Sequence, residues 1–171
     1  EAKKNILTLI EGFRRYKTYL CLGDPMQLVL AGIKGNDFGQ IEDMIRRSGM
    51  SSSIHLTGYI TQEQKKILLG SATALIHPSW YEGFGFTPLE AMAGGCPVIC
   101  SRAGSLPEVV GTDNALFFDP ADAEVLAHHM DKIVQDETLQ SALRQRGFRW
   151  VSRYTWERTA QQTLDVLTKW E

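Results

Sequence analysis

Apolar and polar residues alternate along the chain with two periods, which predict helices and strands in turn. Residues 4–15 place Ile6, Ile10 and Phe13 on one face of a helix. Residues 27–32 form a continuous apolar run that ends at Gly32, which is typical of a strand buried in a parallel sheet. Further helices are expected over 38–48, 61–69, 88–93, 106–110, 121–135 and 137–151 and after Thr155, with strands over 53–57, 73–77, 97–100 and 115–118.

This order of elements predicts one α/β domain over residues 1–171, with a helical C-terminal tail. Strands that alternate with helices favour a Rossmann-like, doubly wound parallel sheet with right-handed crossovers. Ligands of such sheets bind beyond the carboxyl ends of the strands. Gly32, Gly58 and the loops 77–86 and 101–105 all fall at such ends, so we expect them to converge on one rim.

Composition is that of an ordinary globular domain, with 43% hydrophobic and 22% charged residues. A net charge of -2 gives no reason to expect a nucleic-acid partner. Local basic features are interpreted as solvated helix faces rather than binding patches. They comprise Arg14 and Arg15, and the run Arg144, Arg146, Arg149 and Arg153.

Location and redox state are predicted from the apolar runs and the cysteines. No apolar run approaches the ~18 residues of a membrane span, and no signal peptide opens the chain. Cys21, Cys96 and Cys100 are odd in number and lack metal or redox spacing. We therefore expect reduced, mostly buried thiols in a cytoplasmic protein, with at most peripheral membrane contact.

The most informative segment is a glycine-rich turn between two carboxylates, Glu82 and Glu90. Thr87, Pro88 and Glu90 match a capping box, which predicts that a helix begins at Pro88, and Gly94-Gly95 gives its end. The amides of residues 83–86 would then lie at the positive end of the helix dipole, where a diphosphate can bind. Glu82 can accept hydrogen bonds from sugar hydroxyls, and Glu90 can hold a ribose diol.

Simpler interpretations of the same residues are open. Glu90 can be only the acidic member of a capping box, and the glycines only a strand-to-helix turn. His77 can be satisfied by backbone rather than act in catalysis. Ser101 and Ser105 can be turn residues or donor contacts, and Trp80 and Tyr81 can pack or shape a pocket.

A longer set of motifs resembles the C-terminal, nucleotide-sugar-binding domain of retaining glycosyltransferases of the GT-B fold, family 4. These motifs are the run HPSWYEGFGFTPLEAMAGGCPVI over 77–99, GSLPEVVG over 104–111 and LFFDP over 116–120, with Lys4-Asn5-Ile6, Ala31-Gly32-Ile33-Lys34-Gly35 and Gly58-Tyr59-Ile60. Glu82 and Glu90 match the Glu-x7-Glu motif of that family. The resemblance implies a fragment that lacks the N-terminal acceptor domain and the first strand of its own domain. The usual arginine, five residues before the motif lysine, would fall just upstream of Glu1.

The resemblance also implies roles for individual residues. Lys4 and Glu82 would be catalytic, with Lys4 on the donor diphosphate and Glu82 on the sugar hydroxyls. The donor-binding residues would be Gly83, Phe84, Gly85 and Phe86, with Glu90 on the ribose, Ile60 at the base edge, and Gly32. The chain has no Asp-x-Asp pair, and no metal or cofactor is expected.

The activity implied is transfer of a hexose from a nucleoside diphosphate sugar, such as GDP-mannose or a UDP-hexose, to a glycan, lipid-linked or small-molecule acceptor. Gly32-Ile33-Lys34-Gly35 resembles a subgroup that uses mannose donors. Two alternatives are a sugar-nucleotide epimerase or phosphorylase of the same fold, and a non-catalytic nucleotide-sugar-binding module. Lack of a pyridoxal phosphate lysine motif counts against the phosphorylase, and the intact Glu82 and Glu90 pair counts against degeneration.

Overall fold

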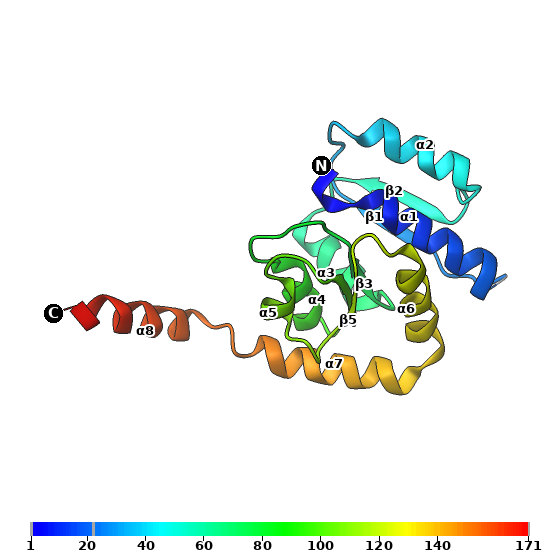
Figure 1. Ribbon diagram of the computed structural model, residues 1–171. Helices are drawn as coiled ribbons and strands as arrows, with labels where there is room; N and C mark the ends of the chain where they lie inside the picture. The colour runs from blue at the N-terminus through cyan, green and yellow to red at the C-terminus, as the bar shows by residue number, and fades with distance from the viewer. Residues whose placement is uncertain (1, 22, 171) are drawn as a thin grey trace.

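Helices and strands alternate along the computed structural model, which describes residues 2–21 and 23–170 (Figure 1). In chain order the elements are the 3-10 turn η1 (Ala2–Lys4), α1 (Ile6–Arg15), the π-helical η2 (Tyr16–Leu20), β1 (Leu28–Ala31), α2 (Phe38–Ser48), β2 (Ile54–Gly58), α3 (Gln62–Ser71), β3 (Leu75–His77), α4 (Phe86–Ala93), β4 (Val98–Ser101), α5 (Leu106–Val110), β5 (Leu116–Phe118), α6 (Ala123–Gln135), α7 (Glu137–Val151), α8 (Trp156–Leu167) and the 3-10 turn η3 (Thr168–Trp170). Each predicted element is present, with small differences at its ends. The α/β prediction is confirmed.

All strand pairs are parallel, but they form two sheets rather than the single sheet that was expected. β1 pairs with β2, and β3, β4 and β5 form the second sheet in that order. Within the described residues, β1 pairs with β2 only and β3 pairs with β4 only, so no strand pairing connects the two sheets.

One hydrophobic core nevertheless contains buried residues of both sheets together with residues of α1 and α6, which pack against each other. Buried members of this core include Leu9, Ile10 and Phe13 of α1, Leu28 of β1, Ile54 of β2, Ile99 of β4, Phe118 of β5, and Leu126 and Met130 of α6. A second cluster lies under α4, α5 and α7 and contains Met92, Val98, Cys100 and Val110. The three cysteines are free thiols, as expected, and Cys96 and Cys100 are buried.

The predicted helix over 4–15 is interrupted at its second residue. Asn5 has φ 54° and ψ 40°, a left-handed conformation that separates η1 from α1. Its buried side-chain amide donates to Pro78 O at 3.0 Å and to Pro120 O at 2.7 Å. Asparagine is one of the few residues that adopts this conformation readily, so these bonds fix the break.

Helix α4 begins two residues earlier than predicted, and the capping box at Thr87 is wrong. Gly85 is the N-cap, with φ 99°, and no side chain caps this helix. The chain turns into the helix at a glycine because glycine adopts positive φ without a Cβ clash. Glu90 therefore lies in the second turn of α4, out of reach of the N-cap. By contrast, Thr61 and Gln64 do form a capping box at the start of α3, and the Thr155 side chain caps α8.

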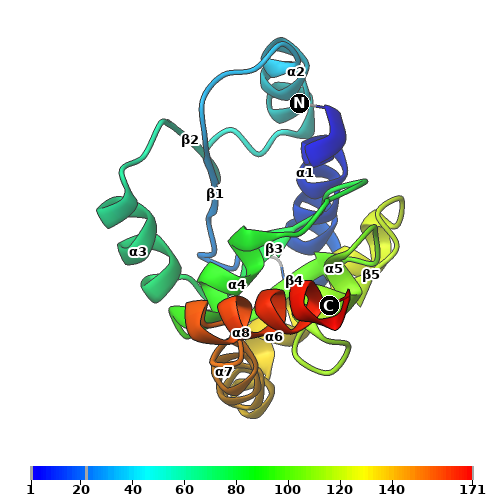
Figure 2. The ribbon, with the colours of Figure 1, turned by 90° about the vertical axis from the view of Figure 1, so that its left-hand side faces the viewer.

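The C-terminal helix α8 extends away from the rest of the molecule (Figure 1). No residue of α8 is buried. In Figure 2, where the side from which α8 projects faces the viewer, α8 runs across the front of the molecule. No helix in the described ranges 2–21 and 23–170 is both long enough and apolar enough to cross a membrane.

Candidate functional site

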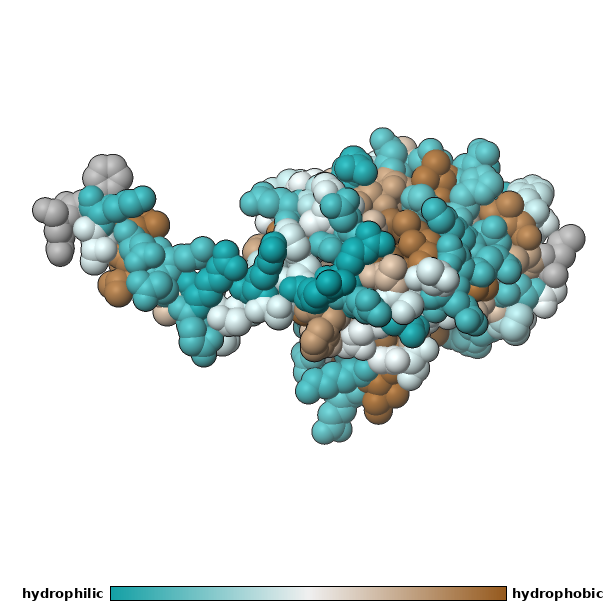
Figure 3. All heavy atoms as spheres, turned by 90° about the horizontal axis from the view of Figure 1, so that it is seen from below, coloured by the Kyte–Doolittle hydropathy of each residue, from teal (hydrophilic) through white to brown (hydrophobic). Residues whose placement is uncertain are grey.

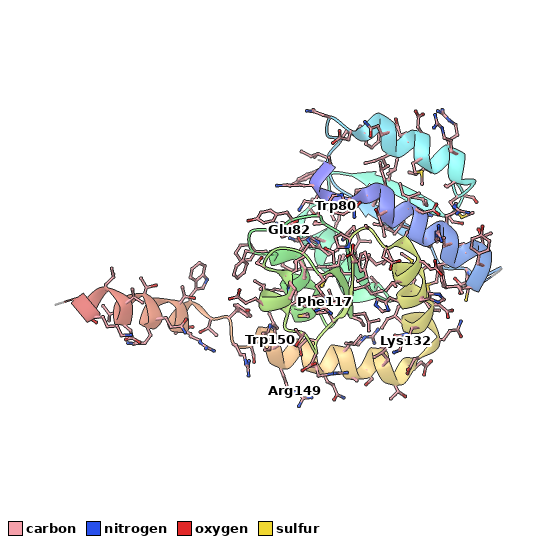
Figure 4. All side chains as sticks on the ribbon, viewed as in Figure 1. Trp80, Glu82, Phe117, Lys132, Arg149 and Trp150 are labelled. Carbon is pink, nitrogen blue, oxygen red and sulfur yellow. The ribbon has the colours of Figure 1, made fainter. Side chains whose placement is uncertain are left out.

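Glu82 lies in the loop between β3 and α4 (Figure 4), and three side chains contact one of its carboxylate oxygens. Lys4 Nζ lies 2.6 Å from Glu82 Oε1, and Ser79 Oγ donates to the same oxygen at 2.9 Å. His77 Nε2 lies 3.2 Å from it. No residue that the structure describes donates to Oε2 of Glu82. That second oxygen is thus available to accept a hydrogen bond from a ligand.

The surroundings of Glu82 favour an ionised carboxylate beside a neutral imidazole. Burial by itself raises the pKa of Glu82, but hydrogen bonds from Lys4 and Ser79 outweigh it and lower the pKa below its usual value. Burial lowers the pKa of His77, and the nearby Lys4 charge acts in the same direction while Glu82 opposes it. At neutral pH, His77 therefore orients Glu82 as an uncharged partner.

Lys4 reaches Glu82 because the backbone around it is tied to the same loop. The Asn5 side chain holds Pro78, which follows β3, and Pro120, which follows β5. The Trp80 amide N–H donates to Lys3 O at 2.8 Å. The N-terminal segment and the loop after β3 are thereby fixed as one unit.

The loop that follows β4 supports the other side of Glu82. Ser105 Oγ donates to Glu82 O and to Phe84 O, both at 3.0 Å. Gly104 has φ 53°, and a Cβ there would come within 2.6 Å of Glu82 O, so glycine is required. Ser101 is buried and donates to Ser79 O at 2.5 Å. Ser101 and Ser105 are thus loop-supporting residues, one of the two roles proposed for them.

The backbone amides of residues 83–86 form a cluster of donors at the start of α4. Across the part of the chain that the structure describes, none of these four N–H groups donates to an acceptor. Gly85 is packed so closely that a Cβ would lie 2.7 Å from Leu106 Cδ2. Unpaired N–H groups and the positive end of the helix dipole together favour an anion.

Glu90 is paired with Lys65, which the sequence did not indicate. Lys65 Nζ of α3 lies 2.7 Å from Glu90 Oε1. Glu90 is exposed, so its other oxygen faces solvent. Because this carboxylate has no capping role, the interpretation of Glu90 as only a member of a capping box is excluded, while its contact with a ribose stays a prediction.

Gly32 and Ile60 lie apart from this network, at the ends of the other sheet. The Gly32 N–H donates to Gly58 O at 2.9 Å where β1 and β2 end, and Gly32 is exposed. Ile60 is half-buried in the short link from β2 to α3. The structure therefore joins Lys4 and Glu82 directly, and it places Gly32 and Ile60 on a separate part of the rim.

Sequence reasoning missed Ser79 and the side-chain role of His77. His77 contacts Glu82 and lies 3.4 Å from Ser79 Oγ, rather than being satisfied by backbone. The available signal was that His77 and Ser79, both polar, stand five and three positions before Glu82. Nothing in the sequence pointed to Lys65. Within residues 2–21 and 23–170, no group of three His, Cys, Asp or Glu side chains is arranged to hold a metal ion.

Residues 1–150 match the model of the family described as Glycosyl transferases group 1. Among curated proteins, the O-antigen chain mannosyltransferase B of Escherichia coli is 33% identical over 166 residues, which is 97% of this chain and 43% of that protein. This chain thus spans less than half the length of that relative.

Solved structures share the fold. The sucrose-phosphate synthase of Thermosynechococcus elongatus superposes with a TM-score of 0.86 and 27% identity, over 99% of this chain and 43% of the other. Anabaena HepE in complex with UDP gives a TM-score of 0.85 with 21% identity, over 99% of this chain and 46% of the other.

Proposed function

Because the chain belongs to the family of group 1 glycosyl transferases, we propose that it is the donor-binding domain of a retaining, family 4 glycosyltransferase. The longer protein would transfer a hexose from a nucleoside diphosphate sugar to a glycan or lipid-linked acceptor, which the remaining domain would bind. One observation supports this most strongly: the Lys4–Glu82 pair, joined at 2.6 Å, lies directly before the unpaired amides of residues 83–86. This arrangement offers an anion site next to a hydrogen-bond acceptor for a sugar.

In this proposal each group acts on a stated part of the donor. Cleavage of the bond between the sugar and the phosphate leaves negative charge on the nucleoside diphosphate. The Lys4 cation and the amides of Gly83, Phe84 and Gly85 stabilise that charge, and they are already oriented before the reaction begins. Loss of one such donor typically slows a reaction about 10²–10³-fold. Glu82 accepts hydrogen bonds from the sugar through Oε2, while His77 and Ser79 hold Oε1.

We propose that transfer needs no divalent metal. Lys4 and the start of α4 supply the positive charge that a metal supplies in other diphosphate sites. Activity of the longer protein should survive EDTA, and a requirement for added Mg²⁺ or Mn²⁺ would contradict this point.

The donor is proposed to be a mannose nucleotide, because the E. coli relative is named a mannosyltransferase and Gly32-Ile33-Lys34-Gly35 resembles mannose-specific members. HepE, which shares the fold, was solved with UDP, so UDP-hexoses are the competing choice. A thermal-shift panel of GDP, UDP and ADP sugars on this chain separates the two, since a bound ligand raises the melting temperature. The panel should respond most to GDP-mannose. A response to none of these nucleotides would refute donor binding.

Glu90 is proposed to hold the ribose diol. Glu90→Ala should weaken binding of GDP about tenfold or more, because a charged hydrogen bond to the ribose is lost. Binding of pyrophosphate, which has no ribose, should not change. Glu63→Ala, at an exposed glutamate in the first turn of α3, is the matched control. Calorimetry that shows equal GDP affinity in the Glu90 variant and the wild type would sink the assignment.

A further inference from the structure

Three arginines, two on α7 and one in the turn that follows it, line a surface hollow that the proposed reaction does not use. Arg146 and Arg149 are three residues apart on one face of α7, and Arg153 lies two residues beyond the end of the helix. With Asn114 and Trp150 they enclose about 190 Å³. We call this feature the arginine hollow.

Within residues 2–21 and 23–170, no carboxylate neutralises the positive charge of the arginine hollow. None of its three arginines forms an ion pair with a carboxylate of the described residues, including Asp113 beside Asn114. Arg14 and Arg46, by contrast, pair with Glu11 and Asp43, although Arg47, Arg102, Arg144 and Arg158 also have no carboxylate partner among the described residues. Three like charges at this spacing repel one another unless an anion lies between them.

The walls of the arginine hollow are held in place by hydrogen bonds and stacking. Trp150 Nε1 donates to Val109 O at 2.7 Å, and the Arg153 guanidinium lies 4.7 Å from the Trp150 ring centroid. The buried Asn114 side chain donates to Val110 O at 2.9 Å. Gly111 permits this packing, because a Cβ there would collide with Asn114 and Trp150. The hollow therefore exists before any ligand binds.

The figures place the arginine hollow on an outer face of the molecule. Figure 4 shows Arg149 on the outer side of α7 and Trp150 on the side toward α5. In Figure 3, strongly hydrophilic side chains gather on the face seen from below, where the arm of α8 begins.

A role limited to the helix dipole does not explain this arrangement. Cations do stabilise a helix C-terminus, but that effect falls off within the last turn, and Arg146 lies before it. The dipole contributes only about half a negative charge, against three formal positive charges. The helix also carries only arginine and no lysine, and the planar guanidinium binds phosphate oxygens in pairs.

We propose that the arginine hollow is a second anion site, which binds the phosphate group of a phosphate ester or of inorganic phosphate. Guanidinium groups of Arg146 and Arg149 grip the phosphate oxygens, and Arg153 is held ready by its stacking on Trp150. This site is independent of the donor site, so it stands whether or not the chain is a glycosyltransferase.

Amide-resolved NMR of the 171-residue chain, titrated with inorganic phosphate and with pyrophosphate, tests the proposal. Saturable shifts are expected at residues 111–114 and 146–153. The double variant Arg146→Gln with Arg149→Gln should weaken binding there about tenfold or more, because two charge-assisted contacts are lost. Arg144→Gln is the matched control, since Arg144 contacts Gln140 and does not line the hollow. It should bind phosphate as the wild type does.

A vesicle assay distinguishes the source of the phosphate. If the wild type floats with phosphatidylglycerol vesicles but not with phosphatidylcholine vesicles, and the double variant floats with neither, the phosphate belongs to a lipid headgroup. Phosphate binding without flotation would identify a soluble phosphate. Shifts confined to residues 83–86, shifts equal in the double variant, or no binding in either assay would overturn the proposal, provided that circular dichroism shows folded variants.

Discussion

Asn5 is the residue on which the geometry of the proposed donor site most depends. It joins the N-terminal segment to two loops and holds Lys4 where it meets Glu82. The sequence indicated Lys4 through its motif but gave no reason for the residue beside it. The reason is steric and polar at once, because Asn5 combines a left-handed backbone with two buried hydrogen bonds.

Replacement of Asn5 separates those two contributions. Asn5→Gly keeps the left-handed backbone and leaves two carbonyls without their donor, which should cost about 1–3 kcal/mol of the free energy of unfolding. Asn5→Ala should cost about 1 kcal/mol more, because alanine disfavours positive φ. Urea unfolding measures both values. Two variants as stable as the wild type would show that Asn5 does not fix the break between η1 and α1.

His77 predicts how stability depends on pH. Its pKa in the folded protein is lowered by burial, so below about pH 6.5 the unfolded chain binds a proton that the folded protein refuses. Stability conferred by neutral His77 is therefore complete above that pH and decreases as pH falls toward the lowered pKa. The lowered pKa of Glu82 adds a separate loss below about pH 4.3.

His77→Gln should flatten the profile of folding stability against pH just below about pH 6.5, and it should leave the loss of stability below about pH 4.3. His128→Gln, at an exposed position, is the control and should keep the wild-type slope. His129, whose pKa burial also lowers, contributes the same background to the wild type and to His77→Gln, while in His128→Gln it loses the lowering that the His128 charge adds. An unchanged slope in His77→Gln, measured by urea unfolding at several pH values, would refute this account of His77.

At the scale of elements, most helices and strands were predictable because their apolar periods and caps are local. Thr61 with Gln64 and Thr155 both cap as the sequence indicates. The start of α4 was not predictable, since Thr87 and Glu90 imitate a capping box while Gly85 provides the turn. The choice between them is made by packing, because Leu106 leaves no room for a side chain at Gly85.

Helix α8 should contribute little to the stability of the rest of the molecule. Its residues are all exposed, so a chain that ends after Thr155 should lose less than about 1 kcal/mol, or about 2–4 °C in melting temperature. A chain that ends after Ser152 should lose more. It lacks Tyr154, whose hydroxyl donates to Val109 O at 3.0 Å and whose ring lies 6.2 Å, edge-on, from Phe84.

Calorimetric melting of the two shortened chains decides this point. Equal losses would show that Tyr154 does not brace the loop before α4. A large loss in the longer of the two would show that α8 itself stabilises the domain.

For the whole molecule, the sequence predicted the parallel α/β layers correctly but not the continuity of the sheet. Strand ends at Gly32, Gly58 and His77 follow from local patterns, whereas pairing depends on which strands are neighbours in space. In the same way, the motif predicted Glu82 and residues 83–86, whereas the contacts of Ser79, Asn5 and Lys65 depend on how distant segments pack, which the motifs do not state.

The central claim is that the amides of residues 83–86, with Lys4, hold the diphosphate of a sugar nucleotide. An NMR titration of the 15N-labelled chain with GDP, and in parallel with UDP, tests it most directly. We expect the four amide signals of residues 83–86 to shift together with one dissociation constant, and Lys4→Gln to weaken that binding about tenfold, because a charge-assisted contact is lost. If both nucleotides leave these four signals unmoved while others shift, the proposed donor site is wrong.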